Sequence, residues 1–164
     1  AQAGQKVLLI DADMRRGHLH HAFHGKGVKG LSELLARRID LEEAVRHSDL
    51  EGLDYVSRGS VPPNPSELLM QQSFHDFLEA MSLRYDLVIV DTPPILAVTD
   101  ATVVGKLTGT SLMVVRFDCN PPGEIKAAKR RLENAGVRLK GGILNGVKKP
   151  TNSRHGLILN FFNR

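Results

Sequence analysis

Short apolar runs alternate with segments of helical periodicity along this chain, a pattern typical of the α/β fold class. Two runs of four apolar residues, at 7–10 and 87–90, are bounded by charged residues and are typical of strands buried on both faces. Further strands are predicted at 111–115 and 142–144, with a less regular one at 53–57. Because helical segments separate these strands, we expect a mostly parallel sheet.

Helices are predicted between the strands wherever apolar residues recur three and four positions apart. One such face, opposite a polar face that carries Glu33, consists of Leu31, Leu34, Leu35 and Ile39. Comparable patterns predict helices at 74–81, 100–106 and 122–134, the last ended by Gly136 in a left-handed conformation. The segment 61–66, VPPNPS, has three prolines and is expected to form a stiff loop that leads into a short helix.

Length and composition bound the classes of protein that remain. A chain of 164 residues fits one domain, 1–164, with an apolar tail at 154–164 that we expect to dock on it or on a neighbour. The single Cys119 excludes an intramolecular disulfide, and no apolar run approaches the roughly 20 residues that cross a bilayer. The net charge of +4 favours anionic partners. The Lys and Arg residues in the C-terminal part of the chain have no aromatic residues between them for stacking on bases, so no nucleic-acid partner is predicted.

Three aspartates stand where the two most apolar strands end. Asp11 and Asp91 close these strands, and Asp13 follows two residues after Asp11, which puts both carboxylates on one side about 6 to 7 Å apart if the backbone stays extended. Such a cluster is costly unless a hard cation offsets the repulsion, and Mg²⁺ bound to phosphates does so with few protein ligands. The three together predict Mg²⁺ and a nucleotide, although any one aspartate could instead cap a strand or helix.

Polar groups beside this cluster add candidate nucleotide contacts. Arg15 and Arg16 follow the acidic pair, and a guanidinium is a good bidentate partner for phosphate. Either arginine could instead pair with a neighbouring carboxylate, and the spacing does not choose between the two. Thr92 supplies a hydroxyl at the turn after Asp91, where the chain must leave the sheet near the nucleotide.

Four segments together resemble a known family. The segment LLIDADMRRG at 8–17 is similar to the second Walker A motif of the bacterial tyrosine kinases, and VIVDTPP at 88–94 is similar to their Walker B motif. Two more segments, VPPNPSELL at 61–69 and the stretch 91–100, resemble the proteobacterial regulators of exopolysaccharide polymerisation and export within that family. Each Walker-type pattern alone is shared with partitioning and division-site ATPases, but the four in this order and spacing are specific.

The resemblance implies a P-loop NTPase-like, doubly wound sheet with helices on both faces. It also implies transfer of the γ-phosphoryl group of ATP to tyrosine, usually between subunits of a ring. By their positions in the motifs, Asp11 and Asp91 would hold Mg²⁺, and Asp13 would serve the metal and help to deprotonate the acceptor tyrosine. Asn145 matches a position that meets the adenine base in related ATPases, and its amide could equally cap a loop.

The partners that the resemblance implies lie partly outside this sequence. They are ATP, the tyrosine-rich tails of neighbouring subunits in a ring-shaped homo-oligomer, and the polysaccharide assembly machinery. Membrane segments of a parent protein would hold the kinase at the cytoplasmic face of the inner membrane, where autophosphorylation would regulate exopolysaccharide synthesis and export.

Two departures from the family pattern qualify this expectation. The motif G-x-x-x-x-G-K-[ST] is absent, since neither Gly-Lys pair, at 25–26 or 105–106, is followed by Ser or Thr. The chain is thus expected to be a kinase domain cut after its first strand, P-loop and helix, inactive by itself and with two unpaired sheet edges. Tyr55 and Tyr85 are the only tyrosines, so the tyrosine-rich tail is also missing.

Two other functions remain possible on these residues. A non-catalytic interaction module with a P-loop-like fold would explain the missing phosphate-binding motif. A partitioning-type ATPase that acts as a spatial switch would share both acidic motifs, but the segments around Asp13 and Ser66 argue against it.

Overall fold

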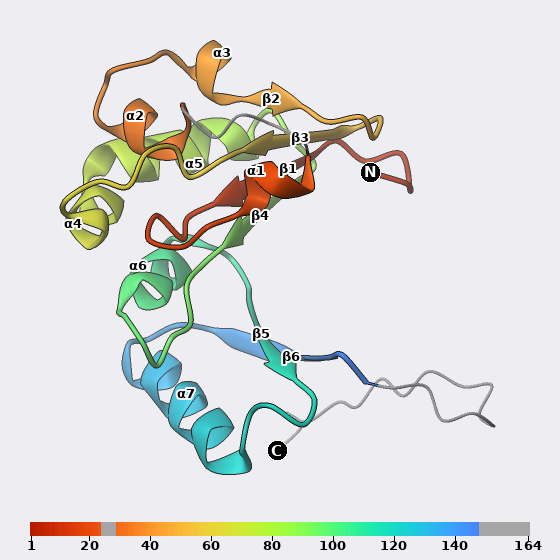
Figure 1. Ribbon diagram of the computed structural model, residues 1–164, viewed down its shortest axis with the longest axis vertical. Helices are drawn as coiled ribbons and strands as arrows, with labels where there is room; N and C mark the ends of the chain where they lie inside the picture. Colours follow the sequence, from red (N-terminus) through yellow and green to blue (C-terminus); the bar gives the residue numbers. More distant parts are fainter. Residues whose placement is uncertain (24–28, 148–164) are drawn as a thin grey trace.

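The computed structural model describes residues 1–23 and 29–147, and its strands form two separate sheets (Figure 1). The larger sheet has the order β2-β3-β1-β4, and the smaller one pairs β5 with β6. The strands are β1 (Val7–Asp11), β2 (Arg46–His47), β3 (Leu53–Val56), β4 (Leu87–Asp91), β5 (Ser111–Arg116) and β6 (Leu139–Asn145). All pairs are parallel except β2 with β3, which confirms the mostly parallel α/β architecture.

The helices occupy the connections between strands, as expected for right-handed crossovers in parallel sheets. They are α1 (Leu19–Ala22), α2 (Leu31–Leu35), α3 (Leu41–Ala44), α4 (Pro65–Met70), α5 (Gln72–Ser82), α6 (Asp100–Leu107) and α7 (Pro122–Asn134). Helix α4 begins at Pro65, where the fixed φ of proline suits the first turn, so the stiff loop ends two residues earlier than predicted. Gly136 has a φ of 76° after α7, which confirms its predicted left-handed conformation.

The main hydrophobic core lies between the larger sheet and the helices that follow it. Its fully buried members come from β1, β3 and helices α2, α4 and α5, and include Leu8, Ile10, Val56, Leu69, Phe74 and Met81. The two phenylalanines Phe74 and Phe77 and Met81 recur at helical spacing on α5, so this helix packs by the face that the sequence predicts.

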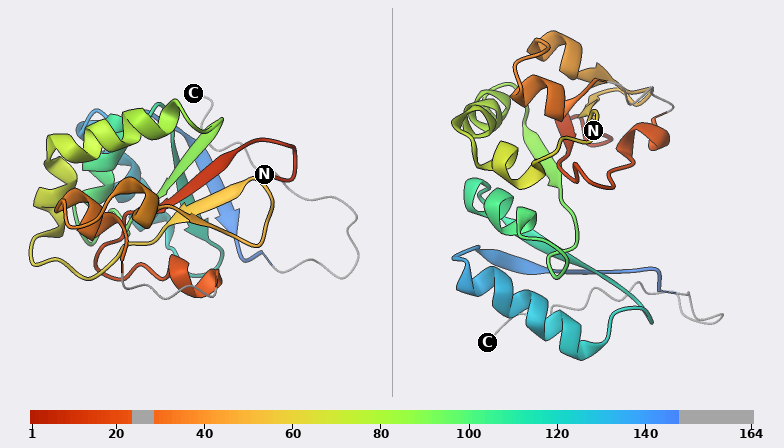
Figure 2. Two further views of the ribbon diagram at one scale, coloured as in Figure 1. Left: turned by 90° about the horizontal axis from the view of Figure 1, so that it is seen from above. Right: turned by 60° about the vertical axis from the view of Figure 1, so that its left-hand side comes forward.

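Strands β5 and β6 form a second unit with α7, and this unit lies below the larger sheet in Figure 1, with α6 between the two. The side view in Figure 2 shows the same separation, with α6 between the larger sheet and the β5–β6 pair. Helix α6 contacts α4 of the larger unit, which links the two regions. Leu112 and Val114 of β5 are 56% and 62% exposed, so this sheet has one largely uncovered apolar face.

Two expectations about burial are wrong. Strand β4 is not buried on both faces, because Leu87 and Ile89 are each 44% exposed. In the described part of the chain β4 pairs with β1 alone and thus ends the larger sheet, which leaves its other edge open as expected. Glu33 is buried instead of solvated, because its carboxylate accepts hydrogen bonds from the amides of Gly30 and Ser60.

Candidate functional site

The acidic residues predicted to act together meet at the carboxyl ends of β1 and β4. Asp11 and Asp91 are register partners in this parallel pair, so they end adjacent strands side by side. Asp13 follows on the loop 12–17, and the backbone amide of Ala12 donates to the carbonyl of Asp91 (2.8 Å), which holds that loop against the end of β4. The position outside the strand ends is where open α/β sheets bind ligands.

Asp11 organises the loop that follows it. Its side chain is fully buried, and its two carboxylate oxygens accept hydrogen bonds from the amides of Asp13 (3.2 Å) and Leu19 (3.1 Å). Gly17 packs so closely on this carboxylate that a Cβ atom at position 17 would collide with it. The absence of a side chain at Gly17 therefore lets the loop close over Asp11.

Asp13 fixes the next turn and keeps part of its surface accessible. One of its carboxylate oxygens accepts hydrogen bonds from the amides of Arg15 (3.1 Å) and Arg16 (2.9 Å). Its carbonyl accepts the amide of Gly17 (2.7 Å). Through these bonds an acidic side chain is held at a defined place on a short, tightly hydrogen-bonded loop.

The three carboxylates influence one another electrostatically. Burial raises the pKa of Asp11, and the charges of Asp91 and Asp13 raise it further, against the lowering effect of its backbone hydrogen bonds. Partial desolvation also raises the pKa of Asp91, with the charge of Asp13 adding to it and a backbone hydrogen bond from Thr92 opposing it. Asp11 and Asp91 end adjacent strands as predicted, and added positive charge would relieve the mutual repulsion of the three carboxylates.

Only a small number of side chains at this edge of the sheet could coordinate Mg²⁺. Among residues 1–23 and 29–147, no group of three or more His, Cys, Asp or Glu side chains is arranged to hold a metal by itself. Asp91 is exposed and Asp13 is half-buried, and both are hard oxygen donors of the kind Mg²⁺ takes alongside water and phosphate. Asp11 is buried behind them, with both oxygens already accepting amide protons.

The other predicted nucleotide contacts lie at different places. Arg16 is exposed on the acidic loop, and Thr92 is half-buried directly after Asp91. The guanidinium of Arg15 is instead engaged with protein groups on α4 and α6. Asn145 is exposed at the end of β6 on the smaller sheet, where its carbonyl accepts the amide of Phe117 (2.8 Å).

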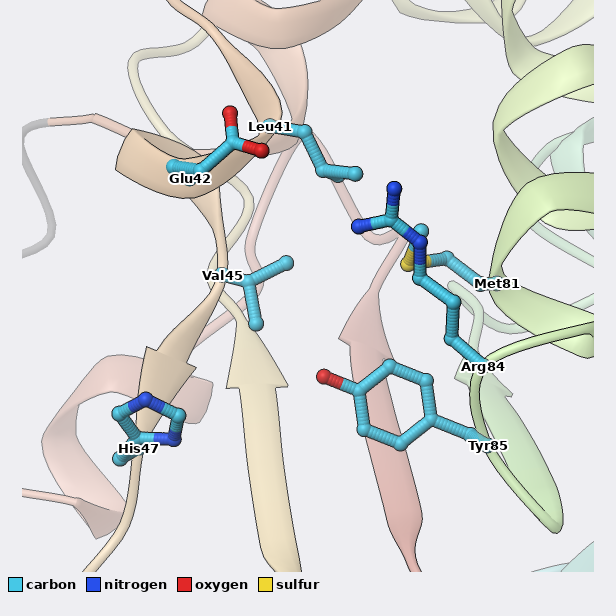
Figure 3. Close-up of a pocket in the computed structure, with 7 residues that line it drawn as sticks. All are labelled: Leu41, Glu42, Val45, His47, Met81, Arg84 and Tyr85. Atoms are coloured by element: carbon cyan, nitrogen blue, oxygen red, sulfur yellow. The ribbon is translucent and has the colours of Figure 1, made fainter.

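A separate pocket of about 240 Å³ lies between α3, β2 and the carboxyl end of α5 (Figure 3). Tyr85 and Arg84 line it just before β4, and His47 lines it from β2. The hydroxyl of Tyr85 donates to Asp54 (2.8 Å), and His47 Nδ1 contacts the other oxygen of that carboxylate (2.6 Å). Burial and the bond to Asp54 raise the pKa of Tyr85 to about 12. None of the predicted site residues belongs to this pocket.

No role was assigned from the sequence to three residues that shape the acidic site. Gly17 was seen only as part of a motif, although a glycine near a strand-end aspartate is a signal for close backbone approach. Ser66 and Asp100 lie in the segments that carry the family resemblance, but their contact with Arg15 spans 51 and 85 residues of sequence. No local pattern predicts contacts of that kind.

Comparison with known proteins first defines the class. The family described as an AAA domain matches residues 1–121, and the chain belongs to it. The septum site-determining protein MinD of Pyrococcus horikoshii, solved with Mg-ADP, has the same fold, with a TM-score of 0.70 at 21% identity over 87% of this chain and 58% of that one. The fold is therefore that of P-loop NTPase-like domains.

Closer relatives narrow the family. Tyrosine-protein kinase etk of Escherichia coli K12 is 52% identical over 94% of this chain, and a putative tyrosine-protein kinase in the cps region of Klebsiella pneumoniae is 49% identical over 95%. The kinase domain of Escherichia coli ETK superposes with a TM-score of 0.88 at 51% identity, over 95% of this chain and 61% of that one. Within the AAA-domain class, the chain belongs to the bacterial tyrosine kinases. It spans about a fifth of the length of these curated relatives, 21% and 22%.

Proposed function

We propose that this chain forms the acidic, metal-binding part of a kinase domain that transfers the γ-phosphoryl group of ATP to tyrosine and thereby regulates exopolysaccharide synthesis and export. The observation that carries this proposal is the side-by-side placement of Asp11 and Asp91 with Asp13, in a chain half identical to tyrosine kinases. The class of reaction matches the site, because phosphoryl transfer depends mainly on positioning and on neutralising charge.

The acidic residues divide the work according to their exposure. Asp91 and Asp13 would hold Mg²⁺ directly or through water, and Asp11 supports them from behind by fixing the loop. When bound, Mg²⁺ supplies charge neutralisation at the β- and γ-phosphates. Asp13 would accept the proton of the acceptor tyrosine. Arg16 and Thr92, which follow Asp13 and Asp91 closely in the chain, would contact phosphate, and Asn145 at the end of β6 would contact adenine.

A phosphate-binding loop is the part of this chemistry that the sequence does not contain. Without its backbone N–H groups and lysine, we expect the chain alone to bind ATP weakly and not to turn over. Among the described residues, β4 and β5 each have one edge without a pairing strand, and this supports the proposal because a strand carrying such a loop could pair there. Residues 1–164 would then act as one partial domain.

The partners and location follow from the kinase family and are part of the proposal. The acceptors would be tyrosines in the tails of neighbouring subunits of a ring, and the regulated system would be the polysaccharide assembly machinery at the cytoplasmic face of the inner membrane. No helix among residues 1–23 and 29–147 is long and apolar enough to cross a membrane.

The proposal is tested on this chain and on the full-length gene product. Calorimetry with ATP and Mg²⁺ and an assay for phosphotyrosine should show strong binding and modification only in the full-length form, both lost on Asp91→Ala. Asp76→Ala, which removes an exposed carboxylate on α5, is the matched control and should leave both unchanged. ATP binding without phosphotyrosine would indicate the partitioning-type ATPase, and binding by neither form would indicate the non-catalytic interaction module.

A further inference from the structure

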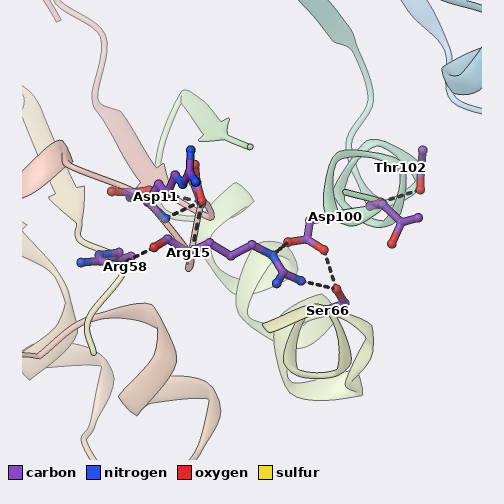
Figure 4. A network of polar contacts seen from close by, with 9 residues as sticks. Asp11, Arg15, Arg58, Ser66, Asp100 and Thr102 are labelled. Carbon is purple, nitrogen blue, oxygen red and sulfur yellow. Dashed lines mark hydrogen bonds and ion pairs between the residues drawn. The ribbon is translucent and has the colours of Figure 1, made fainter. Parts of the chain in front are cut away.

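Arg15 joins the acidic loop to two helices through a closed ring of hydrogen bonds (Figure 4). Its Nε donates to Asp100 Oδ2 (3.3 Å), and its Nη2 donates to Ser66 Oγ (3.0 Å). Ser66 Oγ in turn donates to Asp100 Oδ1 (2.6 Å). The planar fork of the guanidinium suits this arrangement, because two donors leave it in fixed directions.

The two partners of Arg15 are held by rigid elements. Asp100 is the first residue of α6 and its side chain is fully buried, and Ser66 is the second residue of α4. Helices α4 and α6 contact each other directly. The ring therefore has a fixed side, formed by packed helices, to which the loop is attached through Arg15.

The backbone of Arg15 is held as firmly as its side chain. Its amide donates to the carboxylate of Asp13 (3.1 Å), and its carbonyl accepts a hydrogen bond from Arg58 Nη1 (3.1 Å). Asp100 also follows the segment 92–99, which connects Asp91 to α6. A continuous set of contacts thus runs from Asp13 through Arg15 to the helix that follows Asp91.

We infer that Arg15 is a positioning residue, which sets Asp13 relative to Asp91 through Ser66 and Asp100 and does not bind phosphate. This inference rests on the proposed function, since it concerns the metal-binding pair named there. If Arg15 turned toward a phosphate, the buried carboxylate of Asp100 would lose its cationic partner, and an unpaired buried charge is strongly unfavourable. The phosphate contacts near this loop are then left to Arg16.

The kinetic test compares four variants of the full-length gene product: Arg15→Gln, Arg15→Lys, Ser66→Ala and Asp100→Asn. A positioning role predicts that each lowers kcat by about 10- to 100-fold, because small misplacement of a reacting group costs that much, with little change in KM for ATP. Arg15→Lys should not rescue, because an ammonium group cannot reproduce the two-donor fork. The double variant Arg15→Gln/Asp100→Asn should be no worse than either single one.

A second measurement does not depend on kinase activity. Amide hydrogen exchange of this chain should show faster exchange at residues 13–17 in Ser66→Ala and Asp100→Asn, while the amides of α5 keep their wild-type rates. Ser73→Ala and Asp76→Asn on α5 are the matched controls and should leave the loop unchanged. If the wild-type protein has no kinase activity, the proposed function is wrong, but the exchange result for residues 13–17 can still be obtained.

Three outcomes would overturn the inference. The first is an increase in KM for ATP in Arg15→Gln that Asp100→Asn does not share, which would make Arg15 a phosphate ligand. The second is wild-type kcat in Arg15→Lys, which would mean that charge alone suffices. The third is unchanged exchange at residues 13–17 in a folded Ser66→Ala variant, which would mean that the ring does not hold the loop.

Discussion

Strand β1 of the larger sheet and strand β5 of the β5–β6 unit are both mostly apolar, yet their side chains are buried to very different extents. Leu8 in β1 is fully buried, with strands on both sides and helices α2, α4 and α5 in the same core. Leu112 in β5 is 56% exposed. Within the described residues, β5 pairs with a single strand, β6. An apolar strand is therefore buried by its neighbours in the sheet and by the layers above it, and its own composition only permits that burial.

The same contrast holds within the larger sheet. Strands β1 and β4 have similar sequences, VLLID and LVIVD, and end in register partners Asp11 and Asp91. Strand β1 lies between β3 and β4, whereas β4 pairs with β1 alone in the part of the chain that the structure describes. Asp11 is accordingly buried, while Asp91 is exposed, so position in the sheet gives the ends of two similar strands different access to solvent.

Substitution of matched leucines tests this contrast with the largest expected effect. Leu8→Ala should cost about 2 to 5 kcal/mol of unfolding free energy, because it leaves a cavity in the core. Leu112→Ala should cost less than about 1 kcal/mol, since the side chain is already half in solvent. Urea unfolding followed by circular dichroism gives both values, and similar losses in the two variants would contradict the contrast.

Removal of the buried carboxylate in the larger unit should have the next largest effect. Glu33 accepts hydrogen bonds from the amides of Gly30 and Ser60 and from the Ser60 hydroxyl, so Glu33→Ala should cost about 3 kcal/mol by leaving buried donors unpaired. Glu79→Ala on the exposed face of α5 is the control and should be close to neutral. Urea unfolding of both variants at pH 7 measures the difference.

The pH dependence of Glu33→Ala provides an independent check. Burial acts to raise the pKa of Glu33, but its hydrogen bonds from Ser60 and Gly30 outweigh that effect and lower the pKa. A lowered folded pKa means that this carboxylate stabilises the fold above its ordinary pKa and stops doing so as the pH falls through the folded value. The gap between wild type and variant should therefore narrow in acid, and a gap that widens would refute this assignment.

Gly17→Ala should have a smaller effect on stability, about 1 to 3 kcal/mol, because its methyl group would push the Asp11 carboxylate out of place. Faster amide exchange at Asp13 and Leu19, the two donors to Asp11, would report the displacement directly. Gly123→Ala in α7, where a Cβ atom meets nothing within 4 Å, is the control. Equal effects of the two substitutions would show that Asp11 does not depend on Gly17.

The smallest effect is expected from Asp91→Asn, which should raise Tm by about 2 °C at most at pH 7, because solvent screens this exposed group. The pKa of Asp91 is raised in the folded state, so its ionisation destabilises the fold as the pH rises from the ordinary pKa of aspartate through the folded value. The gain should vanish near pH 3, where Asp91 is protonated in both states. Asp76→Asn is the control, and calorimetry that finds Asp91→Asn less stable than this control at pH 7 would contradict the repulsion among the three aspartates.

Sequence patterns predicted the parts of this molecule in which local spacing and burial agree. They placed β1, β5, α5 and α7, and they placed Asp11 and Asp91 at the ends of β1 and β4, which are neighbours in the sheet. They missed β2, with two residues, and the four-residue helices α1 and α3, because such short elements carry no period. Glu33 was misplaced for a related reason, since the loop near Ser60 that covers it comes from a distant part of the chain.

The candidate site shows the same division between local and distant information. The spacing of Asp11 and Asp13 and the matching end of β4 were visible in the sequence, whereas the engagement of Arg15 was left open between phosphate and carboxylate. In the structure Arg15 contacts the carboxylate of Asp100, which lies 85 residues away in the sequence. Only tertiary packing of α4 on α6 brings the two partners of Arg15 together.

The two outer strands of the larger sheet differ in a way that bears on handling of the protein. Strand β2 has only two residues, Arg46 and His47, and such a short, basic strand is a poor template for aggregation. Strand β4 has five residues, and its Leu87 and Ile89 side chains are exposed. We expect this edge strand to pair with strands of other molecules as the protein concentration rises. This chain should therefore aggregate through β4. The substitution Ile89→Lys should keep the protein soluble at concentrations at which the unsubstituted chain precipitates.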